Sequence, residues 1–225
     1  MRVKEVLIAL ESLGSEAVRQ SQERFGIKTD KTHGITAPQL KALARRIGNS
    51  HELAAELWET GVLEARILAA LIEEPAKVTR TQMDRWARAF DNWGVCDACC
   101  CYVFRKTPFA RDKVVEWSGK NGEFVKRAGF ALMAYLAIHD KMSGDDAFAE
   151  WLPIIKRESD DDRPYVRKAV NWALRQIGKR NSRLNQLAIH TALEIRERGT
   201  RSARWIASDA LRELQSANVR TRLGL

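Results

Sequence analysis

The sequence predicts an all-α protein. Its 225 residues include only five prolines and 13 glycines, and Ala, Leu, Glu, Arg and Lys, which form helices readily, are abundant. Apolar residues recur at three- and four-residue spacing along nearly the whole chain, the pattern of helices with one buried face. No run has the composition and two-residue alternation of a strand. With 45% hydrophobic and 30% charged residues, the composition excludes a disordered, collagen-like or disulfide-scaffold protein.

Turn and capping residues separate the predicted helices. The first pair is expected at 3–13 and 16–25, followed by a polar loop at 26–34. Thr36 and Gln39 read as a capping box with Pro38 in the first turn. Further helices are predicted at 40–47, 51–58, 63–73, 82–90, 94–105, 108–117, 123–139, 145–157, 164–178, 183–198 and 203–214.

Three more helix starts have candidate caps. Asp91 or Asn92 precedes the helix at 94–105, Thr107 precedes Pro108, and Asp162 precedes the helix at 164–178. Each has a side-chain oxygen that can accept a hydrogen bond from a free backbone N–H of the first turn. The charged run at 157–163 is expected to be a solvated turn.

A weak internal repeat favours a solenoid over a large bundle. The segments 124–128 (FVKRA) and 165–169 (YVRKA) share an aromatic residue, Val, two bases and Ala, and they lie 41 residues apart. This spacing falls in the range of HEAT and armadillo repeats. We therefore expect one domain, 1–225, built as a right-handed α-solenoid of about twelve helices in antiparallel pairs.

The positive charge is concentrated in the C-terminal part of the chain. The formal net charge is +9, but residues 163–225 contain 14 Lys and Arg against four Asp and Glu, while residues 1–162 carry a net charge of −1. Such a segment favours a polyanionic partner, because Lys and Arg that neutralise phosphates release counterions. A solvated basic helix surface without a nucleic-acid partner is the alternative.

The remaining sequence features favour a cytoplasmic protein without metal or cofactor. No apolar run approaches the ~20 residues that span a bilayer, and the N-terminus has no signal-peptide core. The four cysteines lie within 96–101, and we expect them to be small core residues, because Cys101 points away from the others and His139 and His190 stand alone. Phosphate-binding loops and nucleophile elbows are lacking, so nucleotide hydrolysis and esterase chemistry have no support.

The segment 90–97 contains a carboxylate in an unusual place. Trp93 and Asp97 are four residues apart and so share one helix face. Asp97 is flanked by Val95, Cys96, Ala98 and Cys99, where an acidic residue costs desolvation free energy unless something uses it. The alternative is an acidic residue near a helix N-terminus, where the helix dipole favours it.

Two further segments carry conspicuous basic residues. Arg127 lies in 124–130 among residues that otherwise pack helix against helix. Lys168, Trp172, Arg175 and Lys179 follow the spacing i, i+4, i+7, i+11 and share one face. An aromatic residue among bases can form a nucleic-acid surface, although a Trp at helical spacing is often a core residue.

Together these segments resemble a known family. The segments 92–97, 125–128 (VKRA) and 168–175 (KAVNWALR) look like the three signature regions of the AlkD-like DNA glycosylases, HEAT-like-repeat enzymes that remove cationic alkylpurines from DNA. The elements 34–38 (GITAP), 57–58 and 64–66 are similar to weaker family features. Gly94 departs from the pattern, because bulkier or acidic residues are common there, and so does the cysteine cluster.

The resemblance implies a site and a chemistry. Asp97 would be the catalytic carboxylate, Trp93 and Trp172 would line the deoxyribose of the lesion, and Arg127 would grip the adjacent phosphate. A base alkylated at N3 or N7 is cationic and leaves as a neutral molecule, so the enzyme needs only to stabilise the positive charge that develops on the sugar. No lysine Schiff base is called for, and family members leave the base stacked.

The expected partner is double-stranded DNA that contains alkylated purines, bound by a monomer. Arg127, Lys168, Arg175 and Lys179 are the predicted DNA-binding residues. Two alternatives remain: an inactive family member that binds branched or distorted DNA, and a helical scaffold for protein partners.

Overall fold

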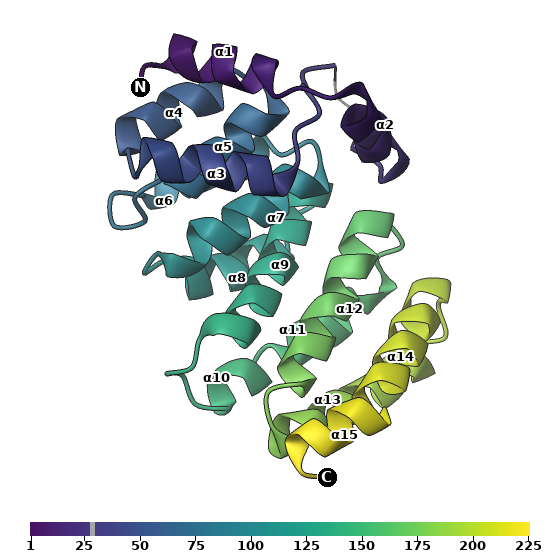
Figure 1. Cartoon of the computed structure of the whole chain (residues 1–225). Helices are drawn as coiled ribbons and strands as arrows, with labels where there is room; N and C mark the ends of the chain where they lie inside the picture. Colours follow the sequence, from purple (N-terminus) through teal and green to yellow (C-terminus); the bar gives the residue numbers. More distant parts are fainter. Residues whose placement is uncertain (28–29) are drawn as a thin grey trace. The chain divides into compact units, whose positions relative to one another are not determined.

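The computed structural model describes residues 1–27 and 30–225, and this part of the chain is helical throughout (Figure 1). It contains fifteen α-helices, two 3₁₀ segments and no strand, which confirms the all-α prediction. The thirteen ranges predicted from the sequence become fifteen α-helices for two reasons. The helix expected at 145–157 breaks in two near Trp151, and a short helix follows Ser216 at the C-terminus.

The chain contacts divide the protein into two compact units, Met1–Thr107 and Pro108–Leu225. A single domain over 1–225 stays a prediction, and each unit is described by itself. The first unit contains α1 (Val3–Ser12), α2 (Glu16–Arg24), α3 (Ala37–Ile47), α4 (His51–Glu59), α5 (Leu63–Ile72), α6 (Arg80–Arg88), α7 (Trp93–Tyr102) and η1 (Phe104–Lys106).

Aromatic stacking organises the core of the first unit. The rings of Trp58 and Trp86 are parallel, with centroids 4.1 Å apart, and both side chains are fully buried. Phe90 meets Trp58 edge-on at 6.1 Å, and Phe104 lies 6.2 Å from Trp86. The stack therefore ties α4 and α6 to the chain segments that flank α7, and each such pair adds about 0.5–1.5 kcal/mol beyond its burial.

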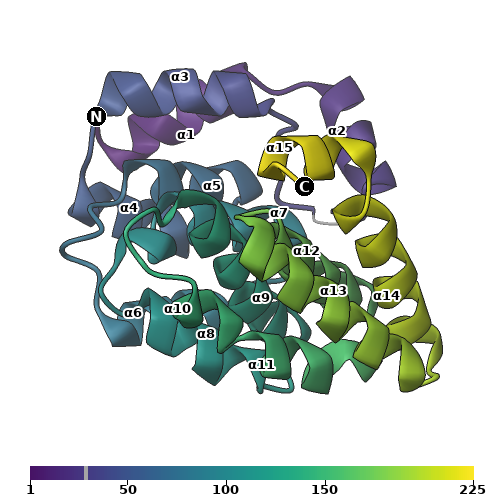
Figure 2. The same cartoon turned by 90° about the horizontal axis from the view of Figure 1, so that it is seen from below.

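The second unit is layered around α12. It contains α8 (Ala110–Ser118), α9 (Glu123–His139), α10 (Asp146–Ala149), α11 (Leu152–Arg157), η2 (Glu158–Asp160), α12 (Pro164–Gly178), α13 (Ser182–Glu197), α14 (Arg201–Leu214) and α15 (Ala217–Leu223). Helix α12 packs against α9, α13 and α14. Figure 2 shows α12, α13 and α14 side by side.

The two segments that match in sequence also meet in space. Phe124 on α9 and Tyr165 on α12 occupy corresponding repeat positions, and their ring centroids are 5.3 Å apart. The 41-residue repeat therefore corresponds to two helices that pack on each other through equivalent residues, as in stacked helical repeats.

The helix starts confirm two of the predicted caps and correct two. The Thr36–Gln39 capping box forms, and Asn92 rather than Asp91 caps α7. Thr107 is no N-cap: its hydroxyl donates to the carbonyl of Phe104 at 2.8 Å, which closes the 3₁₀ turn, and α8 starts only at Ala110. Asp162 is no N-cap either, because Pro164 takes the first helical position and leaves Arg163 as the cap.

The charged run at 157–163 is not simply a solvated turn. Glu158 and Asp161 accept hydrogen bonds from the buried ammonium of Lys126 at 2.8 and 3.1 Å. Burial alone would raise the pKa of the Asp161 carboxyl, but hydrogen bonds from Arg163 and Lys126 outweigh it and hold that pKa below its ordinary value. The run thus fastens the first turn of α9 to the segment before α12.

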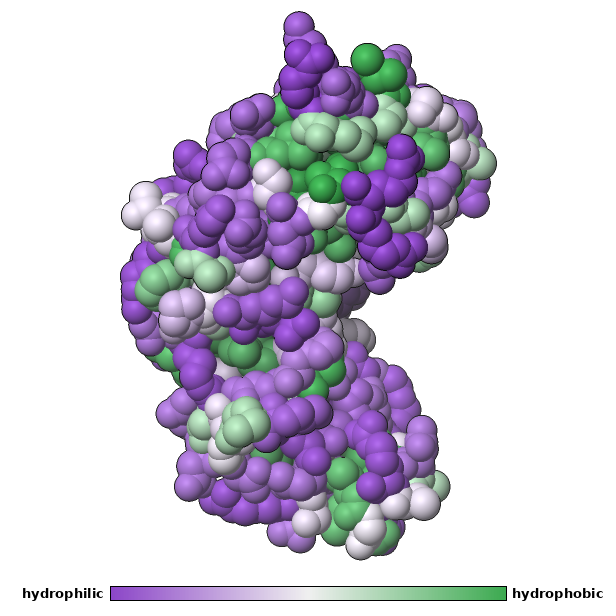
Figure 3. Space-filling model, turned by 60° about the vertical axis from the view of Figure 1, so that its left-hand side comes forward, coloured by the Kyte–Doolittle hydropathy of each residue, from purple (hydrophilic) through white to green (hydrophobic). Residues whose placement is uncertain are grey.

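The face of the molecule drawn in Figure 3 is mostly polar. On the face drawn in Figure 3, hydrophilic side chains cover most of the area, with smaller apolar patches between them. Among the described residues, no helix has both the length and the apolar character that a membrane crossing requires.

One glycine allows α8 and α9 to approach closely. A Cβ placed on Gly129 would lie 2.6 Å from the backbone nitrogen of Ser118 and 3.1 Å from the carbonyl carbon of Trp117. Backbone atoms of a packed helix cannot move aside as a flexible side chain can. Gly129 therefore fixes the depth at which α9, with Arg127 two residues earlier, sits against α8.

We expect the substitution Gly129→Ala to lower the free energy of unfolding by about 1–3 kcal/mol, because the added methyl group overpacks this contact. The gain in helix propensity, up to about 1 kcal/mol, offsets only part of this cost. Urea denaturation of Gly144→Ala is the matched control, since a Cβ on Gly144 meets no atom within 4 Å. Equal midpoints for the two variants would contradict the close approach.

Candidate functional site

Trp93 and Asp97 lie one turn apart at the start of α7. The Asn92 side chain accepts a hydrogen bond from the backbone nitrogen of Val95 at 3.0 Å and so caps α7, which begins at Trp93. Both predicted site residues are half-buried, whereas Val95 and Cys96 between them are buried. The helix thus turns its apolar side to the core and keeps Trp93 and Asp97 partly accessible, as the spacing predicted.

The indole of Trp93 has a fixed orientation. Its Nε1 donates a hydrogen bond to the carbonyl of Phe25 at 2.9 Å. A Cβ on Gly94 would lie 3.0 Å from Cδ1 of Ile27. The segment that contains Phe25 and Ile27 therefore presses on the first turn of α7, and this contact explains why a residue without a side chain stands at position 94.

A buried carboxylate holds the neighbouring loop. Glu64 is fully buried and accepts hydrogen bonds from the Thr32 hydroxyl at 2.7 Å and the Gly34 backbone nitrogen at 2.9 Å. Gly34 has a φ of 74°, and a Cβ there would lie 2.2 Å from the carbonyl oxygen of Ser15. Glu64 and Gly34, both in segments that resemble the family, thus act in positioning the loop that leads into α3.

Arg66 positions the chain that leads into α7. Its guanidinium lies over the Trp58 ring at 5.0 Å and donates a hydrogen bond to the carbonyl of Ala89 at 3.2 Å. Ala89 stands directly before the segment that carries Asn92 and Trp93. The sequence analysis assigned no role to Glu64 or Arg66. The signal that could have indicated one is that 64–66, together with 57–58, is similar to a weaker feature of the family.

The cysteines of α7 belong to its packed side. Cys96, Cys99 and Cys100 are buried and Cys101 is partly exposed, as expected. Burial raises the pKa of the Cys99 and Cys100 thiols well above the ordinary value, which keeps them protonated and unreactive. In the described part of the chain, no group of three or more His, Cys, Asp or Glu side chains is arranged to hold a metal ion.

Arg127 links two helices of the second unit. Its side chain is 7% exposed, and its Nη1 donates a hydrogen bond to the carbonyl of Tyr165 in the first turn of α12 at 2.9 Å. Much of this guanidinium therefore supports the packing of α9 on α12. A contact to a DNA phosphate stays a prediction, and it would have to use the small exposed part of the side chain.

Trp172 is held at the surface of α12 rather than in the core. It is half-buried and meets the ring of Tyr135 edge-on, with centroids 4.9 Å apart. When the amide oxygen of Gln176 faces it, the indole Nε1 donates a hydrogen bond to that oxygen at 3.1 Å. Like Trp93, it presents an indole whose orientation is fixed by its nitrogen.

The basic residues on the face of Trp172 differ in how their charge is compensated. Lys168 is exposed and has no ion pair with any described residue. Arg175 and Lys179 both pair with Glu213 on α14, with 2.5 Å between Lys179 Nζ and Glu213 Oε1, and Arg175 also lies 3.4 Å from Asp209. Two of the predicted DNA contacts thus fasten α12 to α14.

Glu213 is a residue of this basic face that the sequence analysis did not identify. It lies 34 positions after Lys179 along the chain, and no local pattern connects the two. Burial raises the pKa of Glu213, but the hydrogen bond from Lys179 and the charges of Arg175 and Lys179 leave it below the ordinary value. Glu213 is therefore ionised at neutral pH and neutralises part of the basic face.

The predicted site residues are distributed over both units. Trp93 and Asp97 share one face of α7 in the first unit. The second unit holds Arg127 on α9, the predicted residues Lys168, Trp172 and Arg175 on α12, and Lys179 as the C-cap of α12.

Comparisons with known proteins agree with this fold. A solved structure described as "a new family of proteins related to the HEAT-like repeat DNA glycosylases with affinity for branched DNA structures" matches with a TM-score of 0.80 and 22% sequence identity, over 100% of this chain and 97% of that chain. It confirms the HEAT-like repeat fold. None of the curated proteins matches the sequence. The sequence model of the family described as DNA alkylation repair enzyme covers residues 6–214. The chain therefore belongs to the DNA alkylation repair enzyme family.

Proposed function

We propose that this protein is a DNA glycosylase that hydrolyses the N-glycosidic bond of cationic alkylated purines, N3-methyladenine and N7-methylguanine, in duplex DNA. The observation that carries the proposal is the partly accessible carboxylate of Asp97, one turn after the oriented indole of Trp93 on a capped helix. The enzyme would act as a monomer without metal or cofactor.

The reaction makes modest demands on the protein. The alkylated base is already cationic, so the electron pair of the C1′–N bond neutralises it as the bond breaks, and no general acid is required. Positive charge develops on the deoxyribose, and the Asp97 carboxylate stabilises it and orients the water that adds to C1′. The products are the free base, an abasic site and a proton.

The two indoles complete the environment of the sugar. Trp93 and Trp172 present electron-rich faces, and each adds about 0.5–2 kcal/mol of cation–π stabilisation when it lies against the developing charge. Contacts of this kind reach the deoxyribose from outside the DNA duplex. They require no pocket for an extruded base, so the base can stay stacked, unlike in glycosylases that flip it.

Phosphate contacts would position the damaged strand. Lys168 is the basic residue of this face that is free to move to a phosphate, while Arg127, Arg175 and Lys179 are engaged within the protein. Cations that are paired within the protein still contribute to the electrostatic potential that attracts DNA. Direct contacts to phosphates fix the register of the DNA on the protein.

The substitution Asp97→Asn tests the catalytic carboxylate. We expect single-turnover release of 7-methylguanine from a defined duplex to fall by at least about 100-fold, as for the loss of a group that stabilises charge in the transition state. DNA binding should be unchanged or tighter, because a negative charge is removed. Asp91→Asn is the control, since Asp91 is an exposed carboxylate six residues away whose side chain only accepts a hydrogen bond from Asn92.

Equal losses in the two variants would show that Asp97 acts only through its general charge. If the wild-type protein releases no base, the glycosylase proposal fails for this lesion.

The substitution Glu213→Gln tests the engaged cations of α12. Removing this negative charge frees Lys179 and leaves Arg175 with only the more distant Asp209, at 3.4 Å. We therefore expect duplex binding to become tighter and log K to depend more steeply on salt, by up to about one unit of slope per new phosphate contact. Fluorescence anisotropy over about 50–200 mM salt measures this. Glu197→Gln removes the same charge from an exposed position on α13 as a control. Identical affinities would contradict the assignment of Arg175 and Lys179 to the DNA face.

A second candidate function is the recognition of branched DNA without catalysis. The solved structure described above carries that description. It predicts salt-sensitive binding to a four-way junction, insensitive to Asp97→Asn, with no release of 7-methylguanine. A protein-interaction scaffold would instead bind its partner with little dependence on salt.

A further inference from the structure

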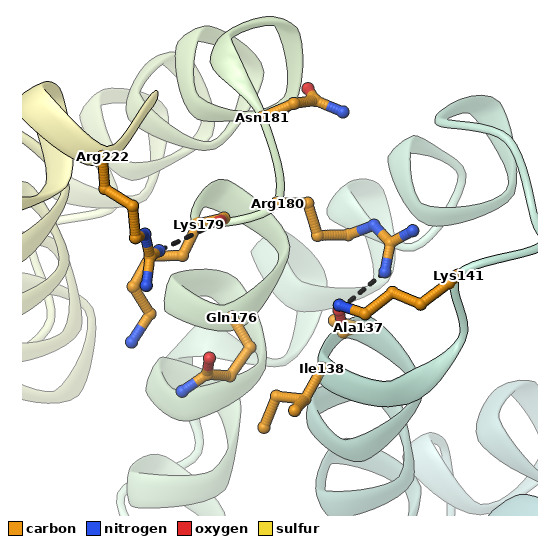
Figure 4. A pocket seen from close by; sticks show the side chains of 8 residues that line it. All are labelled: Ala137, Ile138, Lys141, Gln176, Lys179, Arg180, Asn181 and Arg222. Atoms are coloured by element: carbon orange, nitrogen blue, oxygen red, sulfur yellow. Dashed lines mark hydrogen bonds between the residues drawn. The ribbon is translucent and has the colours of Figure 1, made fainter. Parts of the chain in front are cut away.

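A basic pocket opens in the second unit beside Trp172. It has a volume of about 270 Å³ and lies where the ends of α9 and α12 meet α15. Six polar side chains contribute to its lining: Lys141, Gln176, Lys179, Arg180, Asn181 and Arg222 (Figure 4). We call this cavity the basic pocket.

The cations of the basic pocket exceed the anions around it. None of its described lining residues is acidic. Lys141 and Arg222 are exposed, and neither forms an ion pair with a described residue; Arg222 donates only to the carbonyl of Lys179, at 2.9 Å. Lys179 alone has a carboxylate partner, Glu213. Four positive charges therefore face one pocket that has a single direct counterion.

Arg180 forms the wall of the pocket on the α9 side. Its guanidinium donates hydrogen bonds to the carbonyls of Ala137 and Asp140 at 2.6 and 2.8 Å and lies 3.7 Å from the Phe148 ring centroid. Its buried Nε has no hydrogen-bond partner. The carboxylates of Asp140 and Asp145 act on it only from a distance, and burial, the larger effect, lowers its pKa. An arginine that is held by carbonyls and an aromatic ring, without a carboxylate, gains from an incoming anion.

The basic pocket adjoins the proposed reaction site along one helix. Gln176, which lines the pocket, can accept a hydrogen bond from the Trp172 indole and one from Lys179 Nζ. Trp172 and Lys179 are seven residues apart on α12, about 10 Å along the helix axis. For a strand that runs along α12, with about 3.4 Å of rise for each phosphate, this separation corresponds to roughly three nucleotides.

We propose that the basic pocket binds a phosphate group of DNA, about three nucleotides from the sugar that Trp172 contacts. The ammonium and guanidinium groups match a phosphate in charge, and the amide of Gln176 can donate to its oxygens. The Asn181 amide donates instead to the Asp145 carboxylate, at 2.7 Å. The inference rests on the proposed DNA-directed function. It adds to that function an anchor that fixes the register of the strand at a distance from Asp97.

The double variant Lys141→Gln/Arg222→Gln tests the proposal and leaves Arg180 in place. The double variant Lys156→Gln/Arg196→Gln is the matched control. It removes the same charge from the same unit, at a partly exposed position on α11 and an exposed position on α13. Their ion pairs with Glu194 and Glu197 are weak at the surface. Thermal unfolding midpoints of both variants should stay near that of the wild type.

The measurement is anisotropy of a short undamaged duplex with 5′-hydroxyl ends over about 50–200 mM salt. We expect the pocket variant to lose about one unit of the slope of log K against log salt, the loss of one phosphate contact, and the control to lose clearly less. Equal losses in slope and affinity would show a general effect of net charge and overturn the proposal.

A second duplex with 5′-phosphate ends distinguishes the sources of the phosphate. The same difference between the variants on both duplexes assigns the pocket to an internal backbone phosphate. A difference on the 5′-phosphorylated duplex alone assigns it to a strand end and overturns the anchor beside the lesion. Both titrations measure the binding of undamaged DNA, so they test the pocket even if the protein releases no alkylated base. Conversely, base release that depends on Asp97, with no difference between the variants, overturns the pocket and leaves the glycosylase.

Discussion

The contact between α9 and α12 is the constraint on which the second unit depends. The Arg127 guanidinium holds the carbonyl of Tyr165, Phe124 lies against the Tyr165 ring, and Lys126 binds the carboxylates that precede α12. A buried cation is costly unless polar groups satisfy it, so these bonds fix how the two helices pack. Trp172 and the basic pocket lie on the same pair of helices, and their positions follow from this contact.

Several cations therefore serve the fold and the proposed function together. Arg175 and Lys179 hold α14 through Glu213, and Arg127 holds α12, while Lys168, Lys141, Arg180 and Arg222 form no ion pair with a described carboxylate. The excess of positive charge in residues 163–225 is thus partly neutralised inside the structure. Among the cations without a carboxylate partner, Lys168 lies on α12, and Lys141, Arg180 and Arg222 line the basic pocket beside its C-terminal end.

The family and the fold do not decide between catalysis and binding. A HEAT-like repeat fold can present many different surfaces, and function belongs to the residues placed on it. Here the distinguishing group is Asp97, a partly accessible carboxylate beside an indole that the Phe25 carbonyl orients, with Ile27 packed against the same turn of α7. The carbonyl that orients Trp93 lies 68 residues earlier in the chain, so the placement of this indole depends on how the first unit packs.

The sequence by itself determined the helices, two of the proposed caps and the common face of Trp93 and Asp97, because these follow from backbone hydrogen bonds and local periodicity. It also indicated Lys168, Trp172, Arg175 and Lys179 as one face of a helix. Only the tertiary structure decided that Glu213 neutralises part of that face, that Glu64 holds the loop at Gly34, and that Asp161 faces Lys126 rather than solvent. These carboxylates meet their partners 30 or more residues away along the chain, and charge compensation across such distances is set by packing, which no local pattern encodes.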